Sequence, residues 1–419
     1  MMLEFLTEHL LPIACEIAVG ILLIYGFWRY IKAPEMPDSV IPARLPWRKL
    51  LPRVLLWTIA TRLFLYLAAY AIGHFIHPES VSQYGIGHWV RWDANHYLRL
   101  AQNWYVNEGD PRNHIVFYPL YPLLVMGLDQ LLHHTLLSAL IISNLCLVGC
   151  GYLLFRLVEQ RQGIESASRA LKYLMLCPVS LFFSVPYSES LFLLMSLLAV
   201  YLARNRKIHW AVLFGALASS ARMLGLLTAV PIFYECIQMA RERAAGDRGM
   251  FIRQLIKWFC VCCLVACGFG AYLLLNKTIT GDPFTFLTIQ SEHWSQTFGS
   301  LRNTLRYSFD NAIDNDSLHS QLGIWIPQLV AIFSMLALLI ATRKRSHPGD
   351  SAFAILYFYV ALAPTWLLSG PRYLGAMYAL YPLLTLITRR RWQDITLTIL
   401  FILGSAYCGY AYAVMGSML

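Results

Sequence analysis

Long apolar segments recur along this 419-residue chain, separated by shorter polar segments. Residues 10–28, 54–72 and 322–341 are examples, and each is about as long as a helix that crosses the hydrocarbon core of a bilayer. The pattern is that of successive membrane-spanning helices rather than of a soluble core. It predicts an all-α polytopic membrane protein.

The polar segments between the apolar ones indicate the orientation of the chain. Most of the 33 lysines and arginines lie in six clusters, at residues 29–53, 156–172, 204–207, 241–257, 343–345 and 389–391. The positive-inside rule assigns such clusters to the cytoplasm. With all six inside, the chain is expected to cross the membrane about twelve times with both termini outside.

Two apolar segments each join a pair of cytoplasmic clusters and must therefore cross twice. Residues 170–203 are expected to bend near "VPYSES" (185–190), where Pro186 interrupts helical hydrogen bonding. Residues 208–240 are expected to bend near "SSARM" (219–223). The other predicted helices are 9–28, 54–74, 136–156, 253–275, 323–342, 352–368, 373–388 and 394–415.

This threading predicts one integral membrane domain over residues 1–419. It leaves two large extracytoplasmic loops, at 74–134 and 276–321. We interpret the first of them as the loop that carries the catalytic chemistry, for the reasons given below.

The amino-acid composition agrees with this topology and argues against a nucleic-acid partner. Only 13% of residues are charged and the mean hydropathy is +0.53. The net charge of +10 is accounted for by the cytoplasmic clusters, so no nucleic-acid partner is predicted. All ten cysteines lie in apolar segments, which argues against a disulfide framework. The group at 260–267 is interpreted as packing or lipid-facing residues rather than a metal cluster.

Conspicuous charges outside the cytoplasmic clusters all fall on the predicted outer side. Asp93 lies in "RWDANHYLRLAQNWY" (91–105), Glu189 and Arg222 lie at the two outer bends, and Arg372 lies in "SGPRYLG". The threading used the basic clusters alone. Because charge near a membrane is costly unless it has a use, we expect these residues to form one site at the outer face.

Structural alternatives remain open for each of these residues. Asp93 could cap an amphipathic helix that lies on the membrane. Glu189 and Arg222 could pair for structural reasons, and Arg372 could reach lipid headgroups. His96 could be an interfacial packing residue. "YPLYP" (118–122) is interpreted as a rigid re-entry into the membrane.

These residue types suit one kind of chemistry. An aspartate in a partly dry pocket can act as general base for a hydroxyl nucleophile. Arginines can bind a phosphate through bidentate hydrogen bonds. Together they suggest group transfer from a lipid-linked phosphate. A divalent metal is possible if Asp93, Glu189 and Asp282 converge, but no ligand spacing requires one, and no metal site is predicted.

Five motifs resemble those of the PIG-V-like family of GT-C glycosyltransferases, which includes the second mannosyltransferase of GPI-anchor assembly and many prokaryotic homologues. In chain order they are "RWDANHYLRLAQNWY" followed by "VFYPLYPLL", then "FFSVPYSESLFLLMSLLAVYLARN" (182–205), "SSARMLGLL" (219–227), "GDPFTFLTIQSEHW" (281–294) and "GPRYLGAMYALYPLL" (370–384). The chain departs from the family pattern by an additional N-terminal helix and by "RMLG" where "RSNG" is commoner.

The resemblance implies a GT-C fold and an inverting, mannosyltransferase-like enzyme. Its donor would be a polyprenyl-phosphate-linked sugar, its acceptor a glycan or lipid, and its catalysis extracytoplasmic. Asp93 matches the expected general base. The donor phosphate would be bound by Arg222, Arg372 and Tyr373. The residues expected to bind substrate are Trp92, His96, Tyr97, Tyr118, Tyr187, Glu189, Asp282 and Gln290.

Two other functions stay open. A transporter or flippase of a lipid-linked sugar or sugar phosphate would place its charges near the bilayer centre and show an inverted repeat. A subunit with this fold could also merely support a partner enzyme. The short chain favours a prokaryotic cell membrane over the endoplasmic reticulum. The sequence specifies neither the sugar nor the acceptor.

Overall fold

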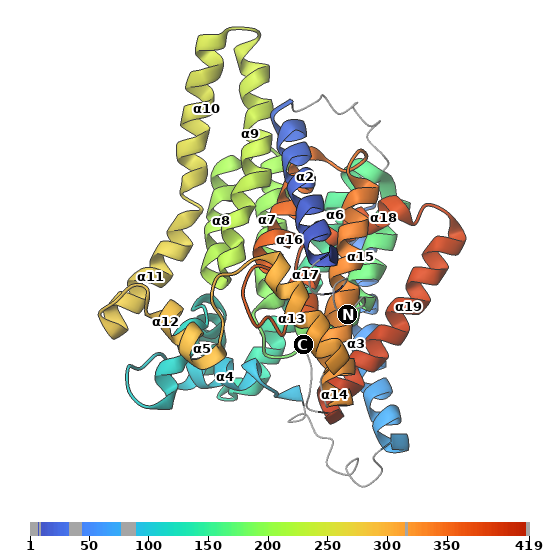
Figure 1. Cartoon of the computed structure of the whole chain (residues 1–419). Coiled ribbons are helices and arrows are strands. Elements are labelled where there is room, and N and C mark those ends of the chain that lie inside the picture. Colours follow the sequence, from blue (N-terminus) through green and yellow to red (C-terminus); the bar gives the residue numbers. More distant parts are fainter. Residues whose placement is uncertain (1–6, 8–9, 33–43, 77–88, 315–316, 416–419) are drawn as a thin grey trace.

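Helices form the protein, as the hydrophobic pattern predicts (Figure 1). The computed structural model describes residues 7, 10–32, 44–76, 89–314 and 317–415. Within those ranges the only β-structure is an isolated bridge between Phe298 and Pro364. The all-α fold class is therefore confirmed. Residues 77–88 of the predicted first loop lie outside the described residues.

The described helices differ widely in length. They are α2 (Leu11–Lys32), α3 (Trp47–Ile76), α4 (Asp93–Asn103), α5 (Leu120–Leu132), α6 (Thr135–Leu176), α7 (Glu189–Arg204), α8 (Ile208–Ala221), α9 (Ala229–Ala244), α10 (Arg248–Cys263), α11 (Ala266–Thr280), α12 (Thr285–Trp294), α13 (Leu301–Asp314), α14 (Leu318–Ser320), α15 (Ile326–Thr342), α16 (Pro348–Ala361), α17 (Gly370–Gly375), α18 (Leu380–Ile387) and α19 (Arg391–Tyr410). Short 3-10 or π turns adjoin them: η4 (Asp110–Val116), η5 (Pro178–Phe183), η6 (Met223–Thr228), η7 (Gln321–Trp325) and η8 (Ala411–Met415).

Seven segments of the described chain are long and apolar enough to span a membrane, or eight if η4 and α5 are counted as one bent span. They make this an integral membrane protein. The count of about twelve crossings remains a prediction. The additional predicted crossings include α7, α8, α16 and α18, which are short. The 16 residues of α7 rise only about 24 Å, less than the hydrocarbon core of a bilayer.

Both predicted bends are present as breaks in the helices. Between α6 and α7 the chain forms η5, and α8 ends at Ala221 before η6 leads into α9. The prediction of one helix over 373–388 is wrong, because the chain divides there into α17 and α18. Pro382 lies in the first turn of α18, where its missing N–H is tolerated but where a longer helix would lose a hydrogen bond. The predicted crossing over 253–275 is present with a short interruption: α10 ends at Cys263, α11 begins at Ala266, and together they form one candidate span, Arg248–Thr280.

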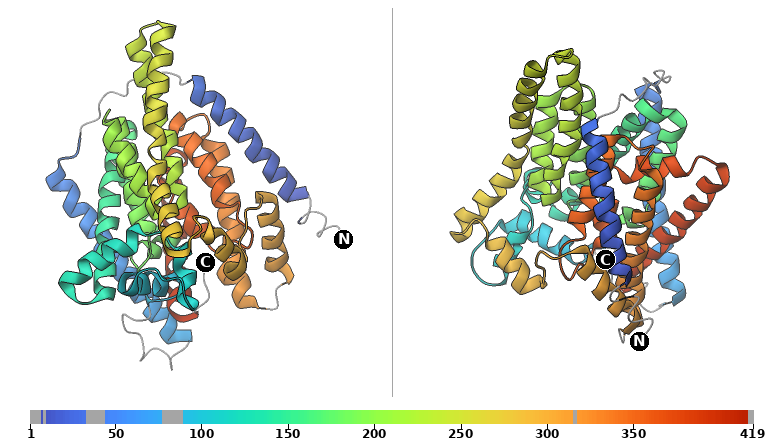
Figure 2. Two further views of the ribbon diagram at one scale, coloured as in Figure 1. Left: turned by 90° about the vertical axis from the view of Figure 1, so that its left-hand side faces the viewer. Right: turned by 45° about the horizontal axis from the view of Figure 1, so that its top comes forward.

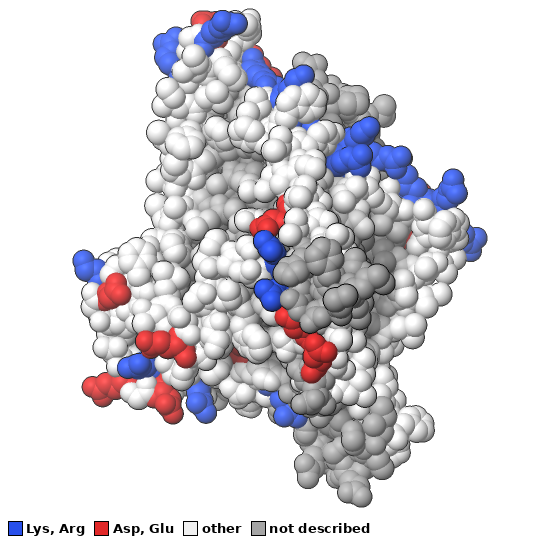
Figure 3. All heavy atoms as spheres, viewed as in Figure 1, with Lys and Arg blue, Asp and Glu red and all other residues white. Residues whose placement is uncertain are grey.

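The two ends of the molecule differ in charge. The hairpin of α9 and α10 projects at one end, and α4, α5 and α12 lie at the opposite end (Figures 1 and 2). On the face that Figure 3 shows, lysines and arginines gather toward the hairpin end and acidic residues toward the other. This distribution agrees with the assignment of the hairpin end to the cytoplasm.

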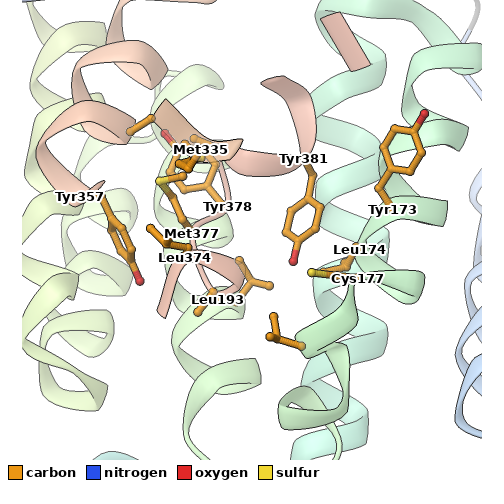
Figure 4. Close-up of a cluster of buried hydrophobic side chains, with 14 of the residues drawn as sticks. Tyr173, Leu174, Cys177, Leu193, Met335, Tyr357, Leu374, Met377, Tyr378 and Tyr381 are labelled. Carbon is orange, nitrogen blue, oxygen red and sulfur yellow. The ribbon is translucent and has the colours of Figure 1, made fainter. Parts of the chain in front are cut away.

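Buried tyrosines tie the short helices into the core (Figure 4). The Tyr357 hydroxyl donates to the Tyr373 carbonyl oxygen at 3.0 Å, and the Tyr381 hydroxyl donates to the Gly375 carbonyl oxygen at 2.7 Å. Both bonds hold α17, which is only six residues long. A buried phenol contributes apolar area and still needs a partner for its hydroxyl, so these bonds fix the position of α17.

Candidate active site

Asp93 is the first residue of α4, and its carboxylate faces an arginine rather than the backbone of its own helix. Trp92 occupies the N-cap position and makes no capping bond with its side chain. Asp93 Oδ2 accepts a hydrogen bond from Arg372 Nη1 at 2.8 Å. The structure therefore does not support the alternative that Asp93 serves only as a helix cap.

The turn that presents Asp93 is strained and held from several sides. Trp92 has φ of +45°, a region that bulky residues seldom adopt. The Tyr187 hydroxyl donates to the Arg91 carbonyl oxygen at 3.0 Å, and the Arg91 amide donates to the Tyr412 hydroxyl at 3.3 Å. The rings of Trp92 and Tyr412 meet edge to face at 5.2 Å. Strain of this kind persists only where the surroundings determine the conformation.

Four charged side chains meet beside this turn, and we call Asp93, Glu189, Arg222 and Arg372 the charged quartet. Glu189 begins α7, Arg222 follows α8, and Arg372 lies in α17. Arg222 Nη1 donates to Glu189 Oε1. Arg372 Nε lies 3.1 Å from the same oxygen, an ion-pair contact that lacks hydrogen-bond alignment. Side chains from four distant segments of the chain thus come together, as the sequence analysis expected.

The four side chains of the quartet differ in burial, with Asp93 the most exposed and Glu189 the least. The exposed fraction of the side chain is 25% for Asp93, 14% for Arg222, 7% for Arg372 and 1% for Glu189. Asp93 Oδ1 makes no hydrogen bond to any described residue. Asp93 is therefore the most accessible member of the quartet, and Glu189 is the most deeply buried. Burial and ion pairing also exclude the alternative that Arg372 extends to lipid headgroups.

Aromatic rings surround the two guanidinium groups. The Arg372 guanidinium lies 5.2 to 5.5 Å from the ring centroids of Phe182, Tyr187 and Tyr373. The Arg222 guanidinium lies 4.7 Å from the Tyr373 ring. Cation–π contacts of this kind keep a buried guanidinium oriented without consuming its N–H donors. These contacts therefore leave unused the N–H donors that do not already pair with Asp93 or Glu189.

A second group of rings adjoins the quartet along α4. His96 stacks on Phe117 with ring centroids 4.9 Å apart and approaches Trp294 of α12 at 6.3 Å. Burial lowers the pKa of His96, with a smaller opposing effect from Asp93, so the imidazole is neutral near pH 7. The Tyr97 hydroxyl shares a hydrogen bond with the Ser188 hydroxyl at 2.8 Å. That bond ties α4 to the residue before Glu189.

The remaining predicted residues do not touch the quartet. Tyr118 stacks on Tyr272 with centroids 4.1 Å apart. Asp282 is exposed, and its Oδ1 accepts from the Phe284 amide at 3.0 Å. Gln290 Nε2 donates to Gln296 Oε1 at 2.8 Å.

The three carboxylates considered for a divalent metal do not converge. Asp282 stands apart from Asp93 and Glu189. Across the described ranges no group of three or more His, Cys, Asp and Glu side chains is arranged to hold a metal ion.

Some residues of the site had no signal in the sequence. Tyr412 supports the strained turn, since its hydroxyl also donates to the Trp89 carbonyl oxygen at 3.0 Å, yet it lies in the apolar C-terminal segment. Phe182, which packs on Arg372, is likewise one apolar residue among many. Only their position in the fold distinguishes them.

The helical membrane fold and the charged quartet define an integral membrane protein with a polar site enclosed by short helices. Residues 53–284 match the model of the Mannosyltransferase (PIG-V) family. This match covers more than half of the chain, and the protein belongs to that family, as its motifs predicted. The matched range contains Asp93, Glu189 and Arg222, whereas Arg372 lies beyond it.

A curated relative supports the same family. The chain is 30% identical over 112 residues to GPI mannosyltransferase 2 from Drosophila pseudoobscura pseudoobscura. The alignment covers 24% of this chain and 24% of that protein, so the chain spans about a quarter of the length of the curated relative that it matches.

Proposed function

We propose that the protein is a GT-C mannosyltransferase that moves a sugar from a polyprenyl-phosphate donor to a hydroxyl group of a glycan or lipid acceptor. The family match and the name of the curated relative support a mannosyl donor. The observation that carries the proposal is the chain of contacts from Asp93 through Arg372 to Glu189 and Arg222. These contacts support the proposal that one base and two phosphate-binding groups act side by side.

In the proposed reaction Asp93 acts as general base. Asp93 Oδ1 accepts the proton of the acceptor hydroxyl while the hydroxyl oxygen forms a bond to the anomeric carbon of the donor sugar. The bond between that carbon and the phosphate oxygen breaks on the opposite face, so the anomeric configuration inverts. The electron pair leaves with the polyprenyl phosphate, and the proton stays on Asp93 until solvent removes it.

Arg222 and Arg372 are proposed to stabilise the leaving phosphate. Negative charge grows on the phosphate as the bond breaks, and oriented cationic donors are most effective against charge that develops in the transition state. Glu189 forms ion pairs with both arginines and keeps two like charges close together. We propose Glu189 as a positioning residue and Tyr373 as the ring that orients both guanidinium groups.

The aromatic residues beside the quartet are proposed to bind the sugar and the acceptor. Trp92 directly precedes Asp93 in the chain, and the rings of Tyr97 and Tyr187 lie 6.4 Å apart. His96 and Tyr118 are proposed to extend this surface. Trp294 of α12 approaches His96, so α12 borders the site and its Gln290 remains available for a larger acceptor. Asp282 lies just before that helix.

The site is proposed to face the extracytoplasmic side of a prokaryotic cell membrane. The basic clusters at the opposite end of the molecule support this orientation. We retain residues 1–419 as one integral membrane domain in which the segments 74–134 and 276–321 form the extracytoplasmic loops. No metal or other cofactor is required by the proposed reaction.

The direct test compares Asp93→Asn with Asp110→Asn. Both remove one charge from an aspartate of the first predicted outer loop, but Asp93 contacts Arg372 whereas Asp110 is exposed and has no proposed role. Purified protein is given radiolabelled polyprenyl-phosphate mannose and a lipid and glycan extract as acceptor. Asp93→Asn is expected to bind donor and to lose transfer by about a hundredfold or more, as for a lost general base. Asp110→Asn should transfer as the wild type does.

Two results would overturn the proposal. Equal transfer by Asp93→Asn and the wild type would remove Asp93 as the base. A wild-type protein that transfers nothing, yet moves the labelled lipid across the bilayer of a proteoliposome, would establish the transporter alternative.

A further inference from the structure

A second polar cavity lies at the far end of α7 from the charged quartet. Glu189 begins α7 and Arg204 ends it, so their backbones lie about 22 Å apart along the helix. Arg204 lines a cavity of about 410 Å³ between α6, α7, the start of α16 and α18. The proposed transfer reaction uses none of its residues.

Arginines dominate the wall of this cavity, which we call the arginine cavity. Its charged lining residues are Arg161, Arg169, Arg204, Arg345, Arg389 and Asp350. Five guanidinium groups thus face one carboxylate. Glu235 and Glu165, which do not line the cavity, pair with Arg161 at 3.5 Å and with Arg169 at 3.0 Å. The net charge of these side chains stays positive even when Glu235 and Glu165 are counted with them.

Part of the wall has a structural role. Arg204 donates to Asp350 Oδ2, and Asp350 Oδ1 accepts from the Tyr378 hydroxyl at 2.9 Å. These side chains are buried and join α7, α16 and the segment before α18. The other arginines are not needed for this link. Arg345 and Arg389 are exposed and make no side-chain hydrogen bond or ion pair to the described residues.

Buried polar atoms of the wall lack partners within the described protein. They include Arg161 Nη1, Ser346 Oγ and His347 Nδ1. Ser346 is only 3% exposed and His347 only 7%. His347 Nδ1 lies 3.9 Å from Asp350 Oδ1, beyond hydrogen-bond length. Because native proteins rarely leave buried donors and acceptors unused, these atoms indicate a ligand with several oxygen atoms.

The backbone beside the cavity is interrupted at a glycine. Gly163 has φ of +81°, which favours glycine and interrupts α6. Arg161 lies just before the interruption, and Ser166 and Arg169 lie in the helix that resumes after it. The first N–H groups of a helix have no intrahelical partner and attract negative charge. Ser166, in that first turn, lines the cavity.

We propose that the arginine cavity binds a phosphate group, carried either by a lipid headgroup or by a soluble phosphate. A phosphate offers more acceptor oxygens than a carboxylate, and guanidinium groups bind it through paired charge-assisted hydrogen bonds. Arg161 and Arg204 form the inner contacts, and Arg345 and Arg389 form the mouth. The surrounding basic clusters indicate the cytoplasmic face, where anionic phospholipids are abundant.

The test measures binding and requires no transfer activity. Native mass spectrometry of the purified protein in detergent counts retained phosphatidic acid against diacylglycerol with the same acyl chains. A parallel scintillation assay measures binding of radiolabelled inorganic phosphate. The variants are Arg161→Gln and the double variant R345Q/R389Q. Arg391→Gln is the matched control, because Arg391 is exposed in the same basic cluster but does not line the cavity.

The wild type is expected to bind at least one phosphate probe, and both variants are expected to weaken that binding about tenfold or more. Arg391→Gln and Asp93→Asn should bind as the wild type does, which separates this result from the fate of the proposed transfer reaction. Retention of phosphatidic acid alone identifies a lipid headgroup as the source. Binding of inorganic phosphate alone identifies a soluble one.

The proposal is overturned if the wild type binds neither probe, or if both variants bind as tightly as the wild type. Arg345 and Arg389 are exposed and have no ion-pair partner among the described residues, so the double variant is expected to fold even if Arg161→Gln does not. Its melting temperature, measured beside that of Arg391→Gln, checks the fold independently.

Discussion

Glu189 and Arg204 lie at the two ends of α7, and the charges around them are balanced differently. The charged quartet has two carboxylates and two guanidinium groups, each paired within a deep aromatic setting. The arginine cavity has five guanidinium groups and one carboxylate in its wall, and its mouth is exposed. A paired cluster keeps its shape without a ligand. A cluster with surplus charge needs a counter-ion to complete it.

This difference suits two different tasks. Buried charge is unfavourable unless it is paired, so the balance of the quartet allows four charged side chains to be held in position before a substrate arrives. Charge that develops in a transition state is stabilised best by polar and charged side chains that are already oriented toward it. The arginine cavity is instead organised for steady binding of an anion.

The largest effect is expected from breaking the quartet at Arg372, the residue that links its two carboxylates. In Arg372→Gln the leaving phosphate loses an oriented cation, and sugar transfer should fall on the order of a thousandfold. Arg372→Lys should retain only part of the transfer rate, because an ammonium group lacks the paired, coplanar N–H donors of a guanidinium group. Transfer rates of purified variants measure this.

Arg302→Gln is the matched control for that experiment, since Arg302 is an exposed arginine of the second predicted loop. It should transfer at the wild-type rate. A wild-type rate in Arg372→Gln itself would mean that the quartet is structural.

Glu189→Gln tests the balance of charge in the quartet. Removing the buried carboxylate leaves two guanidinium groups close together with Asp93 as their remaining partner, and the folded protein should lose about 3 kcal/mol of stability. Denaturant unfolding in detergent measures the loss. Glu165→Gln removes a glutamate whose side chain is 88% exposed and also paired with an arginine, so little change is expected there. Equal stability of the two variants would contradict the account.

Gly163→Ala tests the arginine cavity through the backbone of α6. No atom would contact an added Cβ at Gly163, but φ of +81° is unfavourable for alanine, so a loss of about 1 kcal/mol in stability is expected. Phosphatidic acid should also be retained less well. Gly127→Ala is the control, because its Cβ likewise meets nothing and its φ is not in the left-handed region. If the two variants behave alike, the interruption of α6 does not shape the cavity.

A smaller effect concerns pH. Burial lowers the pKa of His96 in the folded protein, so below about pH 6.5 the unfolded chain binds a proton that the folded chain does not. Stability should therefore fall as the pH is lowered from 7.5 to 5.5, and His96→Gln should reduce that fall. Thermal unfolding at the two pH values measures it. The exposed His209 supplies the control, and His209→Gln should leave the pH dependence unchanged.

The sequence predicted the quartet because charge is rare in this chain and therefore informative. Asp93, Glu189, Arg222 and Arg372 stood out against apolar surroundings. Threading by the basic clusters placed all four on one face. Hydrophobic periodicity likewise predicted the helical fold and both bends, since proline and short polar runs interrupt the apolar pattern there.

The rest depends on tertiary contacts that have no local signal. Tyr412 and Phe182 support the site from apolar segments, where the sequence does not distinguish them from other aromatic residues. The arginines of the second cavity were interpreted only as indicators of orientation, because their clusters are far apart in the sequence. The division between α17 and α18 also follows from packing around buried hydroxyl groups such as that of Tyr381.

The most direct test of the central claim is the anomeric configuration of the product. Wild-type protein is supplied with polyprenyl-phosphate mannose of one known configuration, and the new glycosidic bond is examined by NMR. Direct displacement by a hydroxyl activated at Asp93 predicts a product wholly inverted relative to the donor. A product of retained configuration would require a different nucleophile and would contradict the role given to the charged quartet.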